Sequence, residues 1–137
     1  IVATGGVSYP STGSTGDGLR FAKELGHRIV DVMPSLVPFE IREDFCQRMQ
    51  GLSLKNVSLK MLKGKKVLYE ELGEMLFTHF GISGPLVLSA SCHFTKPEDD
   101  IRIALDLKPA LSEKQLDERI LRDFSHNKNS YFKNSRA

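Results

Sequence analysis

The residues best suited to chemistry lie in the opening stretch, IVATGGVSYPSTGSTGDG. An apolar run over residues 1–4 predicts a buried strand, and a glycine-rich loop leads from it to Asp17, which we expect to cap a helix. Backbone amides and the positive end of a helix dipole meet at such a junction and bind phosphate. The stretch has neither the lysine of a P-loop nor G-x-G-x-x-G. It predicts a nucleotide site, with a plain helix cap at residues 16–18 as an equal alternative.

A second unusual stretch, FTHFGISGP, ends at Pro85. His79 lies beside Thr78, between a predicted strand and a predicted helix, where a side chain could donate a proton or touch a substrate. A structural histidine held by hydrogen bonds is the alternative, and it is the commoner case. Ser83 is expected to cap the helix over residues 84–94, with proline in its first turn.

Composition limits the classes of function. The chain has 137 residues, of which 40% are hydrophobic and 26% charged, as is typical of a folded domain with a core. No apolar run approaches the ~20 residues of a membrane span, and the net charge of +2 is too small to indicate a nucleic-acid partner. Cys46 and Cys92 are far apart. We therefore expect no metal site, two buried structural thiols and a cytoplasmic location.

The first elements along the chain are a helix and short strands. Residues 17–25 are expected to form the helix, which Gly26 ends. The apolar runs that follow are interrupted by Pro34 and Pro38, so they predict edge strands or strand ends.

The rest of the chain predicts an α+β fold with an antiparallel sheet. Apolar and polar residues alternate over residues 52–78, which indicates a meander of three or more short strands, interrupted at Gly73 and compatible with a small barrel. Residues 101–107 alternate in the same way and predict a further strand. Ser112 and Gln115 have the spacing of a capping box and predict the start of the last helix.

Lysines concentrate in the first predicted hairpin, over residues 55–66. They are Lys55, Lys60, Lys63, Lys65 and Lys66. A basic hairpin on a barrel could grip RNA, so a nucleic-acid-binding barrel is an alternative function. However, three glutamates follow within the next strand, and no aromatic platform for single-stranded RNA lies among the lysines. A solvated strand edge guarded by lysines is the favoured interpretation, and we expect no nucleic-acid partner.

Three segments together resemble one family: ATGGVSYPSTGSTGDGLRFAKELGHRI, LKNVSLKMLKGKKV and GEMLFTHFGISGP. In this order, and over nearly the whole chain, they are similar to bacterial flavoproteins known as NAD(P)/FAD-dependent oxidoreductases of the BaiN/YhiN-like type, some of them called aminoacetone oxidases. The resemblance implies a Rossmann-like FAD domain interrupted by a translation-factor-like antiparallel β-barrel and a small helical subdomain. Residues 1–28 would then be the tail of an FAD-domain segment, residues 29–107 the barrel with its packed helix, and residues 108–137 the start of the helical subdomain.

The resemblance also implies a cofactor and a site. FAD would serve the full-length protein, with NAD(P)H as a candidate co-substrate, a small molecule as substrate and the inserted barrel as a lid or substrate-selecting module. The residues that match cofactor-contacting motifs are Ala3, Thr4, Gly5, Gly6, Tyr9, Pro10, Gly16, Asp17 and Gly18. Those expected at the substrate cleft are Thr78, His79, Gly81 and Ser83. The catalytic candidates are His79, Tyr9 and Thr78.

The same resemblance places this chain inside a longer protein. The chain starts in an apolar run without methionine and ends in a polar run. The main dinucleotide fingerprint of the family is not among these residues. We therefore expect the chain by itself to bind FAD weakly or not at all and to show no turnover, with the rest of the FAD domain as its partner and no association with a membrane.

Overall fold

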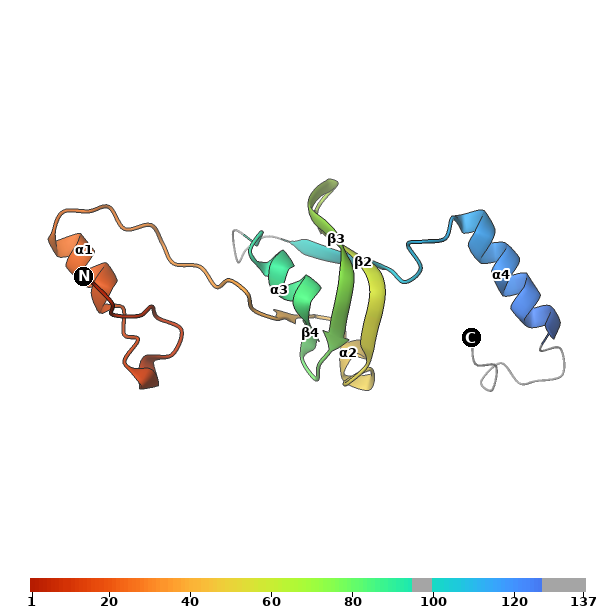
Figure 1. The fold of residues 1–137 in the computed structure, drawn as a ribbon, viewed down its shortest axis with the longest axis horizontal. Helices are drawn as coiled ribbons and strands as arrows, with labels where there is room; N and C mark the ends of the chain where they lie inside the picture. The colour runs from red at the N-terminus through yellow and green to blue at the C-terminus, as the bar shows by residue number, and fades with distance from the viewer. Residues whose placement is uncertain (95–99, 127–137) are drawn as a thin grey trace. The chain divides into compact units, whose positions relative to one another are not determined.

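The structure is a computed structural model that describes residues 1–94 and 100–126. The chain divides into two compact units, residues 1–33 and residues 34–137. The first unit contains a one-turn 3₁₀ helix, Pro10–Thr12, and helix α1, Asp17–Glu24 (Figure 1). The elements of the second unit are β1 (Phe39–Glu40), α2 (Phe45–Arg48), β2 (Ser53–Lys63), β3 (Lys66–Phe77), β4 (Gly81–Ser83), α3 (Pro85–Ser91), β5 (Ile101–Asp106) and α4 (Glu113–His126).

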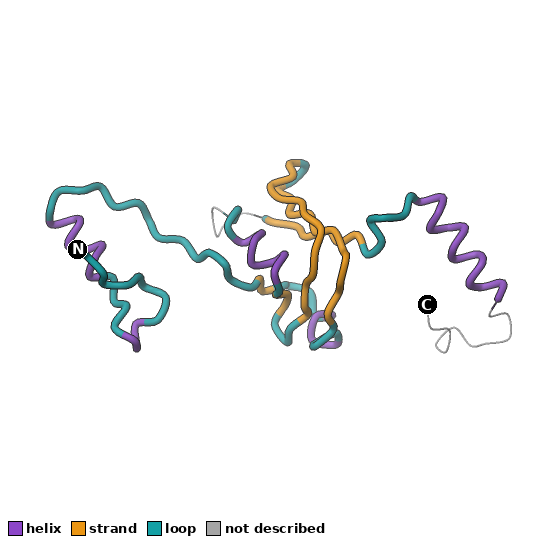
Figure 2. The backbone as a smooth tube through the Cα atoms, viewed as in Figure 1, coloured by secondary structure: helices purple, strands orange, loops and turns teal. Residues whose placement is uncertain are grey.

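The strands form one antiparallel sheet in the order β1-β4-β3-β2-β5. The long strands β2 and β3 make a hairpin at its centre (Figure 2). β5 pairs with β2 from Lys63↔Ile101 to Ser58↔Asp106, whereas β4 pairs only with the last two residues of β3. The result is a half-barrel with β1 and β5 at its two edges. This confirms the α+β class with a barrel-like antiparallel sheet, although the predicted meander over residues 52–78 consists of two long strands.

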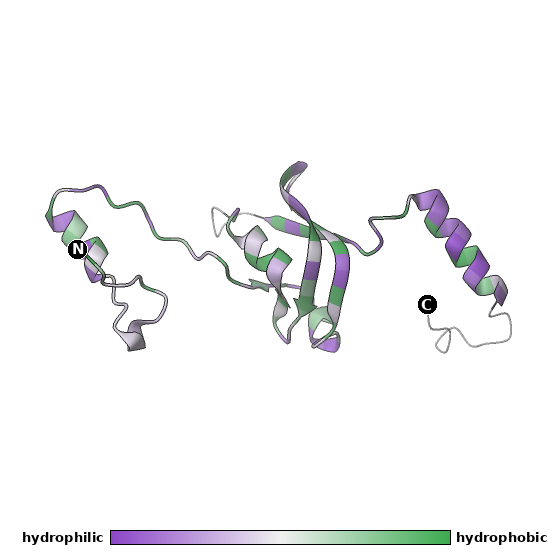
Figure 3. Ribbon diagram, in the orientation of Figure 1, coloured by the Kyte–Doolittle hydropathy of each residue, from purple (hydrophilic) through white to green (hydrophobic). Residues whose placement is uncertain are grey.

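The core lies on the face of the sheet that α3 covers. Alternate residues of the strands are buried there, and the residues between them point to the other face, so the hydropathy colours alternate along β2 (Figure 3). The buried apolar side chains are Val57, Leu59 and Met61 of β2, Met75 and Phe77 of β3, Ile82 of β4, Leu86, Val87 and Ala90 of α3, and Cys46 of α2. Burial of this apolar surface supplies the main stabilising term, about 25 cal/mol per Å².

Two glycines let α3 approach β3 closely. A Cβ atom on Gly73 would lie 3.0 Å from Cγ of Leu86, and one on Gly84 would lie 2.9 Å from Cα of Met75. Both distances are too short for a side chain without a shift of the neighbouring atoms. The strand break predicted at Gly73 is wrong: β3 runs through this residue, which pairs with Val57. The missing side chain makes room for a helix and leaves the ladder intact.

Three further predictions of local structure are wrong. Residues 1–4 form no strand, since no strand of the described chain pairs with them and a strand needs a partner. Asp17 is the first helical residue of α1, after the left-handed Gly16 with φ 83°. Ser83 ends β4, and Gly84 is the residue that precedes α3, although Pro85 begins the helix as predicted.

Helix α4 begins with the predicted capping box. The Gln115 backbone N–H donates to Ser112 Oγ at 3.4 Å, and the Ser112 N–H donates to Gln115 Oε1 at 2.9 Å. These bonds satisfy donors that have no partner within a helix. Residues 127–137 of the predicted helical subdomain lie outside the described residues, and the domain boundaries at residues 28 and 107 stay predictions.

Candidate functional site

The glycine-rich loop of the first unit brings two of the predicted cofactor motifs together. The N–H of Gly16 donates to the carbonyl of Gly6 at 3.2 Å. A Cβ atom on Gly18 would lie 2.4 Å from Thr4 Oγ1, and one on Gly5 would lie 2.7 Å from Ser14 Oγ. The segment of residues 3–6 therefore lies directly against the turn that begins α1. A side chain at either position would displace one of these hydroxyl groups, and the φ of 70° at Gly5 favours glycine there.

Asp17 gives this loop its charge. Its Oδ1 accepts a hydrogen bond from Arg20 at 3.1 Å, and its Oδ2 accepts one from the Thr15 hydroxyl at 3.3 Å. Hydrogen bonds to Asp17 and Glu24 raise the pKa of the Arg20 guanidinium. A carboxylate in the first turn is stabilised by the helix dipole, but its negative charge disfavours a phosphate at the same place. The loop is thus better suited to accept a hydrogen bond from a hydroxyl group than to hold a phosphate.

The remaining predicted cofactor residues lie at exposed positions. Tyr9 precedes the 3₁₀ turn, and its carbonyl accepts hydrogen bonds from the N–H and the hydroxyl of Thr12 at 3.0 and 2.8 Å. The Tyr9 residue itself is 71% exposed. Pro10 begins the turn, and Ala3 is exposed in the extended segment before the loop. The Tyr9 ring is therefore accessible to a ligand.

Gly6 has open space beside its backbone. No atom lies within 4 Å of the position that a Cβ on Gly6 would take. Its backbone is therefore bare on that side, whereas the space beside Gly5 and Gly18 is filled by the loop itself. This opening leaves room for a ligand such as the flavin that the resemblance implies. The loop lacks the lysine of a P-loop, as the sequence indicated.

In the second unit, the predicted cleft residues hold a tight turn between β3 and β4. The N–H of Thr78 donates to the Gly81 carbonyl at 2.9 Å, and the Gly81 N–H donates to Thr78 Oγ1 at 3.1 Å. A Cβ on Gly81 would lie 2.2 Å from the Phe39 carbonyl oxygen, and Ser83 pairs with Leu76. These contacts give Thr78, Gly81 and Ser83 structural roles that need no substrate.

His79 differs from Thr78, Gly81 and Ser83 because it is exposed. It stands edge-on to the ring of Phe80, with the centroids 4.9 Å apart. Within the described chain it makes no hydrogen bond that would hold it in place. Of the four predicted cleft residues, His79 is the one that is free to meet a ligand.

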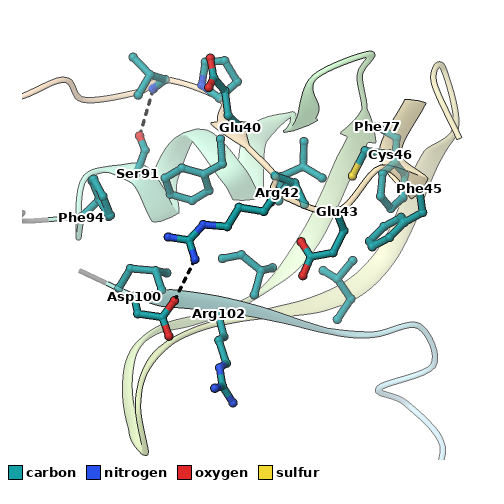
Figure 4. A pocket seen from close by; sticks show the side chains of 18 of the residues that line it. Glu40, Arg42, Glu43, Phe45, Cys46, Phe77, Ser91, Phe94, Asp100 and Arg102 are labelled. Atoms are coloured by element: carbon teal, nitrogen blue, oxygen red, sulfur yellow. Dashed lines mark hydrogen bonds and ion pairs between the residues drawn. The ribbon is translucent and has the colours of Figure 1, made fainter. Parts of the chain in front are cut away.

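Sequence reasoning missed a cavity of about 850 Å³ on the open side of the half-barrel (Figure 4). Its floor is apolar, and Arg42 of one wall pairs with Asp100 of the other at 3.7 Å. The residues that build it include Phe39, Ile41, Cys46, Phe77, Ile82, Ile101, Ile103 and Leu105. None of Thr78, His79, Gly81 and Ser83 is among those that line it. The alternation over residues 101–107 was the one sequence signal for this cavity, and it indicated only one wall. The opposite wall comes from a segment far away in the chain, so the sequence did not indicate that the two walls meet.

The cysteines differ in exposure. Cys46 is buried in the cavity wall, and Cys92 is exposed with its Sγ 3.1 Å from Oγ of Ser35. Burial raises the pKa of the Cys46 thiol, and the nearby Glu43 carboxylate raises it further, so this thiol is no nucleophile at neutral pH. The prediction of two buried thiols is therefore correct for Cys46 and wrong for Cys92, which lies past the last turn of α3.

Neither a metal-binding cluster nor a membrane-spanning helix is found in residues 1–94 and 100–126. No group of three or more His, Cys, Asp or Glu side chains within those ranges could hold a metal ion. No helix there is long and apolar enough to cross a membrane.

Comparison with known proteins links the second unit to a described family. Residues 33–137 match the family model described as "HI0933-like protein barrel and H2TH domain". The chain is 42% identical over 107 residues to a ribosomal RNA dihydrouridine synthase of Haemophilus influenzae, covering 77% of this chain and 25% of the relative. It is 31% identical over 119 residues to a 3-dehydro-bile acid delta(4,6)-reductase of Clostridium scindens, covering 85% and 29%.

A third relative, a ribosomal RNA dihydrouridine synthase of Escherichia coli, is 30% identical over 119 residues, which cover 84% of this chain and 29% of the relative. The chain therefore spans less than a third of the length of each of these three relatives.

Proposed function

The chain belongs to the HI0933-like barrel and H2TH domain family, and from this premise we propose that it serves a flavin-dependent oxidoreductase. The predicted kinship with the BaiN/YhiN-like flavoproteins is confirmed by the family match and the named relatives. That family is related to flavoprotein oxidoreductases.

The observation that carries the proposal is the packing of residues 3–6 against the first turn of α1. Two sequence motifs that are ten residues apart meet there, with Gly16 bonded to Gly6 and Gly18 against Thr4. If residues 16–18 were only a helix cap, residues 3–6 would not need to pack against them. The open backbone at Gly6 offers room for a bound cofactor, and the Asp17 carboxylate offers a hydrogen-bond acceptor.

Gly6 and Asp17 would hold the FAD: the Gly6 backbone would contact it, and the Asp17 carboxylate would accept a hydrogen bond from one of its hydroxyl groups. FAD supplies the hydride and electron transfer when it is bound. Tyr9 and His79, whose rings are exposed, are the candidates for contact with the flavin and the substrate, and the half-barrel acts as a lid or substrate-selecting module.

The substrate has two candidate classes. A small molecule is the class predicted from the sequence, and the apolar cavity of about 850 Å³ supports it. RNA is the second class, because two of the three relatives are named ribosomal RNA dihydrouridine synthases and because the β2–β3 hairpin is rich in lysine. NAD(P)H as the reductant stays a prediction from the resemblance.

The proposal is tested on the intact protein that contains this chain. Flavin content per protein is measured from the visible absorbance, for the unsubstituted protein and for Asp17→Ala. Loss of a hydrogen bond to a charged group costs roughly 1.5–3 kcal/mol, so we expect FAD affinity to fall about tenfold or more. Asp31→Ala is the matched control, because it removes an exposed carboxylate from the same unit.

Two results would contradict the proposal. One is an intact protein that holds no flavin after purification and binds none in a calorimetric titration. The other is an equal affinity of the Asp17→Ala and Asp31→Ala variants for FAD. In the same titration, residues 1–137 alone are expected to bind FAD weakly or not at all.

A further inference from the structure

We propose that the tip of the β2–β3 hairpin binds the phosphate backbone of RNA. The inference rests on the proposed function, since it assigns a surface to the RNA candidate among its substrates. The surface, here called the lysine tip, consists of Lys60, Lys63, Lys65 and Lys66.

The hairpin geometry brings three of these residues, Lys63, Lys65 and Lys66, together at the end of the strands. Gly64 and Lys65 form a two-residue loop between Lys63 and Lys66, and Gly64 has φ 58°, as the first position of a type II′ turn requires. Lys63 and Lys66 are paired directly opposite each other in the last rung. Like charges in that position destabilise a hairpin. A local cost of this kind is expected where a surface serves a ligand.

A bulge next to the tip adds to this arrangement. Met61 pairs with Tyr69 and Leu62 pairs with Val67, so Leu68 is an extra residue on β3. Bulges increase the local twist of a hairpin. The tip accordingly turns away from the rest of the sheet, and it carries the hydrophilic end of the long strands (Figures 1 and 3).

The net charge of the lysine tip is positive. No Asp or Glu occurs between Asp44 and Glu70 in the sequence. Lys60 forms an ion pair with Glu70 at 2.9 Å, and no ion pair of Lys65 or Lys66 is found in the described chain. These two exposed lysines are available to an anionic ligand.

Arg102 of β5 extends the basic surface. It pairs with Leu62 of β2, one rung from the end of the sheet. Arg102 is among the residues that line the cavity, but Figure 4 shows its side chain on the opposite side of β5 from Arg42, which pairs with Asp100. Arg102 and Lys60 lie on the same outer face, two residues apart in register.

The sheet order argues against the simpler explanation of these lysines. Lysines that guard a sheet against aggregation belong on its edge strands. β2, which carries Lys60 and Lys63, is paired with β3 on one side and with β5 on the other. Only Lys66 lies where β3 has an open edge. The predicted solvated edge therefore does not account for the tip.

The chemistry of the tip favours phosphate contacts without base recognition. The nearest aromatic ring, Tyr69, contacts the His93 ring at 5.1 Å between centroids, and its hydroxyl donates to Glu71. It is therefore not a stacking platform of the kind that reads single-stranded bases. Binding through lysines alone is insensitive to sequence and sensitive to salt.

The test is the binding of residues 1–137 to a fluorescein-labelled, uridine-rich RNA of roughly 20 nucleotides, measured by polarisation at several salt concentrations. The variant Lys65→Gln/Lys66→Gln removes two tip charges. The control Lys55→Gln/Lys108→Gln removes two exposed lysines of the same unit outside the tip. Vesicles that contain about 30% phosphatidylserine serve as a second anionic probe.

We expect the tip variant to bind RNA about tenfold more weakly at low salt, with a logarithmic salt slope smaller by about 1.4, because each phosphate contact contributes about 0.7. The control should stay within about twofold of the unsubstituted chain. Three results overturn the inference: equal losses in both variants, no RNA binding by the unsubstituted chain at the lowest salt, or tip-dependent binding to vesicles that is tighter than binding to RNA.

Failure of the proposed function has a separate readout. The flavin content of the intact protein is measured with and without the Lys65→Gln/Lys66→Gln change. Flavin retained by the variant, together with weakened RNA binding, supports the inference. An unsubstituted protein without flavin defeats the oxidoreductase proposal, while the RNA measurement on residues 1–137 still decides the role of the tip.

Discussion

The packing of α3 on β3 can be tested by adding one methyl group. Gly73→Ala would place its Cβ 3.0 Å from Cγ and 3.2 Å from Cδ2 of Leu86. Leu86 is 4% exposed, and its neighbours Val87 and Ala90 are fully buried, so the side chain has little room to move aside. The same helix anchors the turn that carries Thr78 and His79, because it follows β4 directly.

The magnitude follows from two opposing terms. Overpacking a core costs about 1–3 kcal/mol, and alanine is favoured over glycine within a strand by roughly 0.5–1 kcal/mol. We expect Gly73→Ala to lower the free energy of unfolding by about 1–2 kcal/mol. Leu86→Ala alone should cost about 2–5 kcal/mol. In that background the added methyl enters the vacated space, and Gly73→Ala should be neutral or slightly stabilising.

The assay is urea unfolding of all four members of this double-mutant cycle, followed by far-ultraviolet circular dichroism. At a slope of about 1–3 kcal/mol per molar urea, the Gly73→Ala midpoint should fall by roughly 0.5–1 M. The coupling energy between the two sites should be about 2 kcal/mol, within the range found for residues in contact. Additive effects, or a Gly73→Ala protein as stable as the unsubstituted chain, would refute the close packing of Leu86 on Gly73.

Three further predictions concern single side chains. A thiol reagent should modify Cys92 in the folded protein and Cys46 only after unfolding, and two equally fast reactions would contradict this. Burial, and then the hydrogen bond to Glu71, raise the pKa of the Tyr69 hydroxyl from 10.0 to about 12. The hydroxyl therefore stays protonated to a higher pH in the folded state than in the unfolded state. The stability that this proton contributes is fully present below pH 10 and is lost as the pH rises toward 12. Tyr69→Phe should remove that loss and the corresponding step in tyrosinate absorbance. Ser112→Ala should destabilise α4 by about 1 kcal/mol and speed its amide exchange, whereas Ser112→Asp should not.

The sequence alone determined those elements whose residue pattern lies within a single segment of the chain. The alternation over residues 52–78 and 101–107 identified the sheet, because a strand with one buried face must alternate. The spacing of Ser112 and Gln115 identified the start of α4, because a capping box involves only one turn of chain. The glycine-rich loop was located correctly, while the strand expected before it was not.

Tertiary structure decided what depends on partners far away in the chain. Gly73 looked like a strand break, and only the position of Leu86 shows that it is a packing site. The predicted strand edge does not hold for Lys60 and Lys63, because the sheet order places this part of β2 between β3 and β5. The cavity has walls from residues about 60 positions apart, such as Arg42 and Asp100. A pattern within one segment reports which face of it is buried, but not which other segment buries it, and this is the information that pairing and packing supply.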